Sequence, residues 1–129
     1  MDMQSRPDYK YPKLYHDLIR FYSVYWRIHQ HLPKAFQYST GEVILNEITE
    51  ALGRAAAANL AGQSRPEARQ ADDDLQTCRL CLEKVRAFLT LAWEMKLISH
   101  AQMADLGERL DGLGRQAARW RGWFGKNSG

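Results

Sequence analysis

The sequence feature that most constrains the fold is a long apolar stripe between Glu67 and Leu97. Its residues recur at alternating spacings of four and three, which is the heptad pattern of a helix packed lengthwise against other helices. The stripe comprises Ala71, Leu75, Cys78, Leu82, Val85, Leu89 and Ala92. Apolar residues on neighbouring rows widen it, namely Cys81, Phe88, Leu91 and Met95. A stripe of this width is typical of the centre of a helical bundle rather than of a two-stranded coiled coil.

Three other segments show the same spacing, so the sequence predicts an all-α fold, an antiparallel up-down-up-down four-helix bundle. Nothing alternates with a period of two over a useful length, and we therefore expect no sheet. Pro33 ends the first helix, because proline disfavours helical geometry in the residue before it. The expected helices cover residues 12–32, 40–62, 66–97 and 100–123. We expect one domain, 1–129, with flexible ends at 1–11 and 125–129.

Capping boxes predict where the later helices begin. In this motif Ser or Thr is followed three residues later by Glu or Gln, and each side chain bonds the other residue's backbone N–H. The chain has Ser39 with Glu42, Ser64 with Glu67, and Ser99 with Gln102. Within the fourth helix, glycines at 107, 112 and 114 each cost about 1 kcal/mol relative to alanine. We interpret them as sites of close packing or as a weak point of that helix.

The composition fits a compact domain and excludes several classes of protein. The chain has 129 residues, of which 45% are hydrophobic, enough for a buried core. No apolar run approaches the length of a membrane span, and the N-terminal residues lack a signal-peptide core. With two cysteines and no such signal, we expect a cytoplasmic protein without disulfides.

Cys78 and Cys81 have the spacing of a redox or zinc-binding pair. A redox pair needs its attacking sulfur at a helix N-terminus, where the dipole lowers the thiol pKa, whereas this pair lies well inside the expected helix. No second Cys or His pair stands at the spacing of a zinc site. We predict that both thiols are buried and reduced and that ligand binding does not require them.

Other candidates for chemistry are equally weak. Consecutive helical residues point about 100° apart, so Asp72, Asp73 and Asp74 cannot converge on one metal ion, and we expect them to form a solvated acidic face. The chain has four histidines, His16, His29, His31 and His100. No two of them are four residues apart, and no histidine lies beside a nucleophile together with a third group that could orient it. The aromatic residues of the first helix lie mostly at core spacing, which favours packing over base stacking. We therefore expect no catalysis, metal or cofactor.

The distribution of charge is more informative than the net charge of +3. After Asp111 the chain has no acid, and its basic residues are Arg115, Arg119, Arg121 and Lys126. Residues 1–34 are also basic, with Arg6, Lys10, Lys13, Arg20, Arg27 and Lys34 against Asp2, Asp8 and Asp17. The first and fourth helices of a bundle can be neighbours, so these segments can share a face suited to phosphate backbones. The alternative is that the arginines only keep a helix surface soluble.

Several short segments, in this order along the chain, give it a family resemblance. They are Leu32-Pro33-Lys34, Ser39-Thr40-Gly41, Leu82-Glu83-Lys84-Val85-Arg86, Ile98-Ser99-His100-Ala101-Gln102 and Leu113-Gly114-Arg115, followed by Trp120. In these segments the chain resembles the accessory variability determinant (Avd) proteins of diversity-generating retroelements. Those proteins belong to a larger group of bacterial four-helix proteins, which includes proteins encoded in intervening sequences of ribosomal RNA genes. The resemblance covers residues 14–123.

The resemblance implies a small four-helix subunit that assembles as a homopentameric barrel with a positively charged surface. Such proteins bind RNA and DNA without strong sequence preference and associate with the retroelement's reverse transcriptase. They are needed for its mutagenic copying of a template RNA. We therefore expect a non-enzymatic, nucleic-acid-binding accessory subunit, with phosphate contacts from Lys34, Arg86, Arg115, Arg119 and Arg121.

Two departures from the family pattern concern these contacts. The family often has a second arginine four residues after the one that matches Arg86, and here that residue is Thr90. The usual Gly-Gly before the tryptophan is Ala118-Arg119, which adds charge nearby. The alternative is a stand-alone bundle of the ribosomal intervening-sequence type, with a structural or unknown role. A metal- or redox-active bundle is a third class, and it rests only on the cysteines and histidines.

Overall fold

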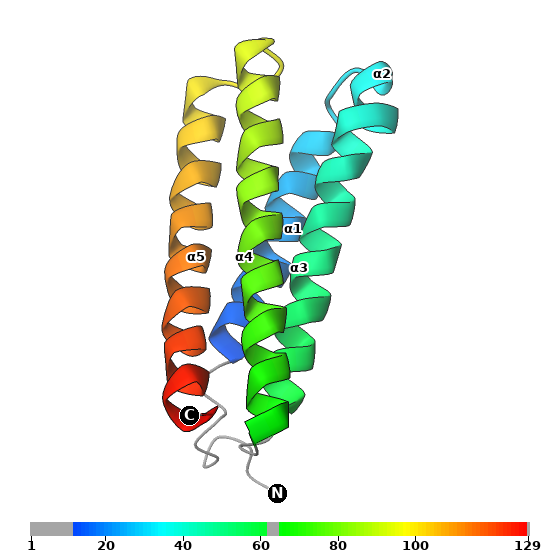
Figure 1. Ribbon diagram of the computed structural model, residues 1–129. Coiled ribbons are helices and arrows are strands. Elements are labelled where there is room, and N and C mark those ends of the chain that lie inside the picture. The colour runs from blue at the N-terminus through cyan, green and yellow to red at the C-terminus, as the bar shows by residue number, and fades with distance from the viewer. Residues whose placement is uncertain (1–11, 62–64, 129) are drawn as a thin grey trace, which may run out of the picture.

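The computed structural model describes residues 12–61 and 65–128, and these residues form helices and no strand. Four long helices pack side by side, which confirms the predicted all-α class (Figure 1). The elements are α1 (Pro12–His29), α2 (Lys34–Phe36), the π-helix η3 (Gln37–Gly41), α3 (Glu42–Leu60), α4 (Arg65–Glu94) and α5 (His100–Ser128). In the described part of the chain, none of the helices is long and apolar enough to cross a membrane.

The four long helices surround one core. Both α1 and α4 contact α3 and α5, so α1 and α4 lie diagonally across the bundle from each other (Figure 1). The short α2 lies at the same end of the bundle as the turn between α4 and α5. This arrangement brings α1, from the start of the chain, beside α5, from its end.

The predicted apolar stripe of α4 is confirmed, because all its residues are at most 3% exposed. On α3, the small residues Ala51, Ala55 and Ala58 are fully buried, which allows α4 to pack closely against that helix. The predicted widening of the stripe is only partly confirmed. Cys81 is buried, whereas Leu91 and Met95 lie on the surface.

The predicted start of the second helix at Ser39 is wrong. The helical backbone begins at Lys34 and continues through α2 and η3 into α3. Ser39 lies inside the π-helix, where its hydroxyl donates a hydrogen bond to the carbonyl of Ala35 (2.6 Å). Gln37 closes the turn after α1 instead, because its side-chain amide donates to the carbonyl of Leu32 (2.7 Å).

Gly41 ends the π-helix at a point of close contact with α1. It is buried, and a Cβ there would lie 2.7 Å from Cε1 of His29 and 2.9 Å from the carbonyl oxygen of Phe36. The missing side chain lets the His29 ring pack directly against this segment. Gly41 is therefore required for packing here.

The capping box at the start of α5 is confirmed. The N–H of Ser99 donates to Oε1 of Gln102 (2.8 Å), and the N–H of Gln102 donates to Oγ of Ser99 (3.0 Å). The proposed box at Ser64 and the predicted flexible residues 1–11 lie outside the described residues. At its other end, α5 continues to Ser128, beyond the predicted end at 123, since glycine disfavours a helix without breaking it.

The glycines of α5 do not mark close helix packing. A Cβ at Gly114 would meet nothing within 4 Å. At Gly107 and Gly112 it would meet only guanidinium nitrogens, of Arg86 at 3.7 Å and Arg115 at 3.9 Å. Of the two interpretations of these glycines, close packing is therefore wrong, because no neighbouring backbone approaches these positions, and the weak point stays a prediction.

Candidate nucleic-acid interface

A groove between α1 and α5 collects basic side chains from segments far apart in the sequence. It has a volume of ≈ 320 Å³. Its lining residues are Lys13, Asp17 and Arg20 of α1 with Arg109, Gly112, Leu113 and Gln116 of α5. The expectation that the first and last long helices are neighbours is thus confirmed.

Asp17 connects the two walls of the groove. Its Oδ2 accepts hydrogen bonds from the Lys13 ammonium and from the Gln116 amide, both at 2.9 Å. Partial burial alone would raise the pKa of Asp17, but these hydrogen bonds and the charges of Lys13 and Arg20 outweigh burial and hold the pKa below its ordinary value. The carboxylate is therefore ionised at neutral pH and fixes Lys13 beside the groove.

The groove keeps a surplus of positive charge. Arg109 is paired within α5, with Nε 3.0 Å from Oδ2 of Asp105. Arg20 is exposed and forms no ion pair with any residue that the structure describes. Gly112 contributes no side chain, so the groove stays open on the α5 side.

Two of the predicted contact residues lie beside this groove. Arg115 Nη2 lies 3.9 Å from where a Cβ of Gly112 would be, which places that guanidinium at the groove edge. Arg119 is three residues after Gln116 and therefore on the same side of α5. Both arginines are exposed, and within residues 12–61 and 65–128 neither has an ion-pair partner.

Arg86 and Arg121 lie at a different seam, between α4 and α5. Nη2 of Arg86 is 2.5 Å from Oδ1 of Asp111. Nε of Arg121 is 3.0 Å from Oδ1 of Asp72, and its Nη1 is 2.5 Å from Oε1 of Gln76. These arginines hold α4 to α5, and nearby acids neutralise their charge. The structure does not bring them to the groove.

Lys34 is also remote from the groove. It belongs to α2, at the end of the bundle opposite the start of α1 (Figure 1). Its ammonium lies 6.0 Å from the ring centroid of Tyr38, in a cation–π contact. The five predicted contact residues therefore occupy three separate places.

The acidic run at residues 72–74 is not the expected solvated face. Asp74 is buried and accepts hydrogen bonds from Arg54 (3.0 Å) and Gln70 (3.3 Å). Asp72 pairs with Arg121, and only Asp73 is exposed. The expectation is wrong for two of the three residues, because arginines of α3 and α5 reach them across the helix seams.

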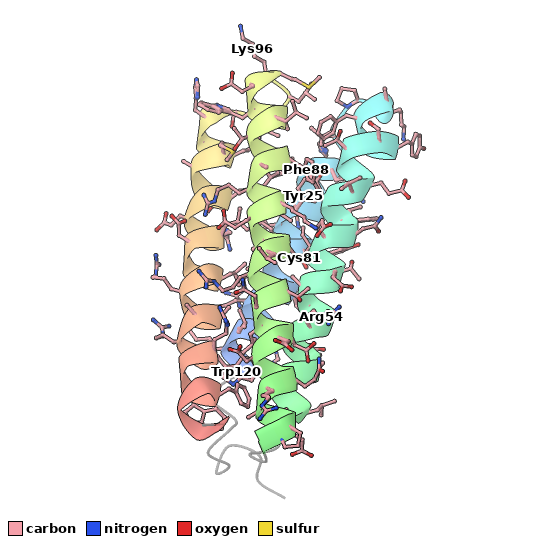
Figure 2. All side chains as sticks on the ribbon, in the orientation of Figure 1. Tyr25, Arg54, Cys81, Phe88, Lys96 and Trp120 are labelled. Carbon is pink, nitrogen blue, oxygen red and sulfur yellow. The ribbon has the colours of Figure 1, made fainter. Side chains whose placement is uncertain are left out.

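The burial of the cysteine pair is confirmed. Cys78 and Cys81 are both free thiols in the core of the bundle, and Cys81 is labelled in Figure 2. Burial raises the pKa of both thiols to about 12, and for Cys81 a hydrogen bond with Glu47 adds to the effect. Both sulfurs stay protonated at neutral pH. The described residues also contain no group of three or more His, Cys, Asp or Glu side chains placed to hold a metal.

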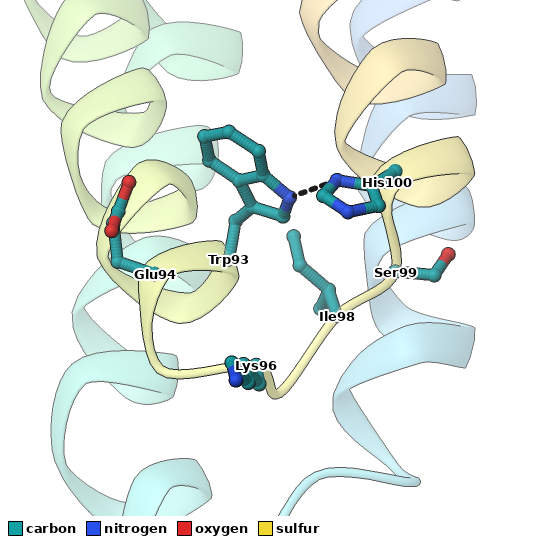
Figure 3. A pocket seen from close by; sticks show the side chains of 6 residues that line it. All are labelled: Trp93, Glu94, Lys96, Ile98, Ser99 and His100. Carbon is teal, nitrogen blue, oxygen red and sulfur yellow. Dashed lines mark hydrogen bonds between the residues drawn. The ribbon is translucent and has the colours of Figure 1, made fainter.

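A second pocket, of ≈ 380 Å³, lies at the turn between α4 and α5 (Figure 3). The indole N–H of Trp93 donates to Nδ1 of His100 (2.8 Å), so this ring nitrogen carries no proton. Lys96 and Glu94 also line the pocket and balance each other's charge. Without a surplus of positive charge, this pocket is not part of the candidate interface.

Comparisons with protein-family models, with curated proteins and with solved structures give no match for this chain. The candidate interface therefore rests on the positions and charges of its own residues. Sequence reasoning named Lys13 and Arg20 only as part of a basic segment, and it missed Arg109 and Gln116. The available signal was a polar row beside the apolar stripe of each helix, with polar residues at 13, 17 and 20 and at 109 and 116.

Proposed function

We propose that this chain is a non-catalytic, nucleic-acid-binding accessory subunit that works with a retroelement reverse transcriptase and its template RNA, as the Avd proteins that it resembles do. The observation that carries the proposal is the α1–α5 groove. Arg20 lines this groove and forms no ion pair with any described residue, and the exposed Arg115 and Arg119 lie beside it. Several cationic side chains along one groove match the regularly spaced negative charges of a phosphate backbone.

The chemistry of the groove favours binding without sequence preference. Arginine and lysine contact phosphate oxygens through charge-assisted hydrogen bonds, which position a strand but do not read its bases. RNA and DNA share these phosphates, so both are ligands of the groove in this proposal. No proton transfer or covalent step is needed.

We also propose the antiparallel up-down-up-down order of the helices, as their apolar periodicity and short links predict, and a homopentameric assembly, as in the resembled family. Apolar residues exposed on α3 and α4 support self-association, since large exposed apolar patches commonly mark interfaces. Among them are Val43 of α3 and Leu80 and Leu91 of α4, and Met95, directly after α4, is exposed as well. A pentamer presents the groove five times, so that weak contacts with one strand add through multivalency.

Fluorescence anisotropy with labelled RNA and DNA strands of unrelated sequence, measured across salt concentrations, tests the groove. We expect the Arg115→Ala/Arg119→Ala and Arg20→Ala/Arg109→Ala variants to bind all sequences more weakly. The slope of log affinity against log salt should flatten by about 0.7 for each phosphate of a single strand that the variant no longer neutralises.

The matched control removes the same charge from α4, which lies diagonally across the bundle from α1, as Arg69→Ala/Arg79→Ala. This variant should keep the affinity and the salt slope of the wild type. If the groove variants remain helical by circular dichroism yet bind with unchanged affinity and slope, the proposal is wrong.

Genomic context tests the association with a reverse transcriptase independently of binding. A neighbouring reverse transcriptase gene with paired variable and template repeats is the expected finding. A gene located inside a ribosomal RNA gene would instead favour the stand-alone alternative.

A further inference from the structure

Trp26 of α1 is exposed, although most aromatic side chains of this helix lie in the core or pack against it. Phe21 and Tyr25 are buried, whereas Tyr22 is half-buried and Trp26 is 42% exposed. The rings of Tyr22 and Trp26 stack, with 6.1 Å between centroids and 13° between planes. The expectation that the aromatic residues of this helix lie mostly at core spacing is confirmed for Phe21, Tyr25 and Tyr22, whereas the exposure of Trp26 needs another explanation.

Contacts on α1 hold the Trp26 ring in place. It also stacks on His29, with 6.1 Å between centroids and 15° between planes. His29 is itself fixed, since it is buried, lies against Gly41 and shares a hydrogen bond with the Tyr25 hydroxyl (3.2 Å). An aromatic side chain ordered in advance loses little conformational entropy when a ligand binds.

A surface pocket of ≈ 420 Å³ adjoins this aromatic row, lined by Tyr22, Ser23, Trp26 and Arg27. Arg27 is exposed, and no ion pair joins it to another described residue. Arg20, two helical turns earlier, lies on the same side of α1 as Arg27 and lines the basic groove. Arg20 and Arg27 therefore form a basic row that leads from the groove to the pocket, whereas Tyr22 and Trp26 lie further round α1, on the side away from Lys13 and Asp17.

We infer that this pocket is a base-stacking site for a single-stranded nucleic acid whose backbone follows the α1–α5 groove. Every base has a π-face that can stack on an aromatic ring, so such a site is sequence-tolerant. In a duplex the bases are stacked on one another and cannot enter the pocket. The inference rests on the proposed function and deepens it, because it makes single strands the preferred ligand.

The charges around the pocket decide between a nucleic acid and a second copy of the chain. Packing the exposed apolar surface of a second copy here would remove Arg20 and Arg27 from water without a partner of opposite charge, which is costly. A phosphate backbone instead supplies that partner. Asp17, the nearby acid on α1, is already bonded to Lys13 and Gln116.

Trp26→Leu and Trp26→Phe in the full-length chain test the inference, with anisotropy measured on a single-stranded RNA and on the duplex of the same sequence. Trp26→Leu should weaken single-strand binding about tenfold, as expected for the loss of one stacked base. Trp26→Phe should retain most of the affinity, and duplex binding should change for neither variant. Binding of the single strand should also quench the tryptophan fluorescence of the wild type more than that of Trp26→Phe.

Tyr38→Leu is the matched control, because Tyr38 is 72% exposed and also lies beside a cation, Lys34, but is remote from the groove. It should leave single-strand affinity unchanged. If Trp26→Leu also leaves the single-strand affinity unchanged, or changes the sedimentation mass instead, the inference is wrong. The groove variants would then still test the proposed function. If the wild type binds neither RNA nor DNA, both proposals fall.

Discussion

Gly41 and Gly53 both lie in helical backbone, but their surroundings differ. A Cβ at Gly41 would lie 2.7 Å from the His29 ring and 2.9 Å from a backbone oxygen, whereas a Cβ at Gly53 would meet nothing within 4 Å. We expect Gly41→Ala to lower the free energy of unfolding by about 1–3 kcal/mol through overpacking. Gly53→Ala should raise it by up to about 1 kcal/mol through helix propensity. Urea unfolding that gives both changes the same sign would contradict the packing of His29.

His29 should give the stability of the protein a pH dependence. Burial lowers the pKa of His29 below its ordinary value of about 6.5, although the charge of Glu42 partly offsets this effect. The unfolded chain therefore takes up a proton near pH 6.5 while the native state stays neutral. The free energy of unfolding should fall as pH decreases from 6.5 towards the native pKa, and His29 should add no pH dependence above 6.5.

Urea unfolding between pH 5 and pH 8 measures this effect. His29→Gln should flatten the fall on the acid side, and His31→Gln, at an exposed position, should retain it. If the free energy of unfolding depends equally on pH in the wild type and in both variants, His29 is not the group responsible.

At the residue scale, sequence reasoning succeeded where periodicity alone decides burial, as for Cys78 and Cys81. It failed for Asp74, because its partner Arg54 is 20 residues away and on another helix. It also missed that Arg86 is neutralised by Asp111, 25 residues away. Long side chains that cross a helix seam leave no local pattern in the sequence.

At the scale of elements, α4 ends in an unusual way. Lys96 has φ 62°, in the left-handed region, and the N–H of Leu97 donates to the carbonyl of Ala92 (2.9 Å), as in a Schellman motif. Glycine normally occupies this position, because a side chain is strained there. Lys96 lies at the tip of the bundle, and its side chain extends away from it (Figure 2).

We therefore expect Lys96→Gly to raise the free energy of unfolding by about 1 kcal/mol. Glu94→Gly, two residues earlier and still helical, should lower it by a similar amount, about 1 kcal/mol. Thermal unfolding followed by circular dichroism measures both. A loss of stability in Lys96→Gly would mean that the lysine side chain stabilises the turn in a way that its geometry does not indicate.

The elements themselves were largely predictable, because apolar periodicity and capping boxes are local signals. The stripe of α4 and the start of α5 at Ser99 were found in this way. The start at Lys34 was not, because Gln37 closes the turn by reaching back to Leu32, an interaction without a recognised motif. Predicting the candidate groove required knowing that α1 packs beside α5. The sequence indicated this packing only as one possible arrangement of the bundle.

At the scale of the whole molecule, the exposed apolar residues of α3 and α4 predict self-association. Sedimentation equilibrium should give about five times the chain mass of 14.9 kDa. Leu91→Glu, which places a charge on the exposed surface of α4, should reduce that mass, whereas Leu60→Glu, at an 85% exposed position at the opposite end of α3 from Val43, should not. A monomer mass for the wild type across micromolar concentrations would exclude the pentamer.

Photo-cross-linking shows where nucleic acid lies on the molecule, which we propose is along α1 and α5. A single-stranded RNA containing 4-thiouridine is cross-linked to the full-length chain, and the attached peptides are identified by mass spectrometry. We predict cross-links within residues 13–27 of α1 and 109–119 of α5, and excess unlabelled RNA should abolish them. Cross-links concentrated on α3 or on the outer surface of α4 would contradict this placement.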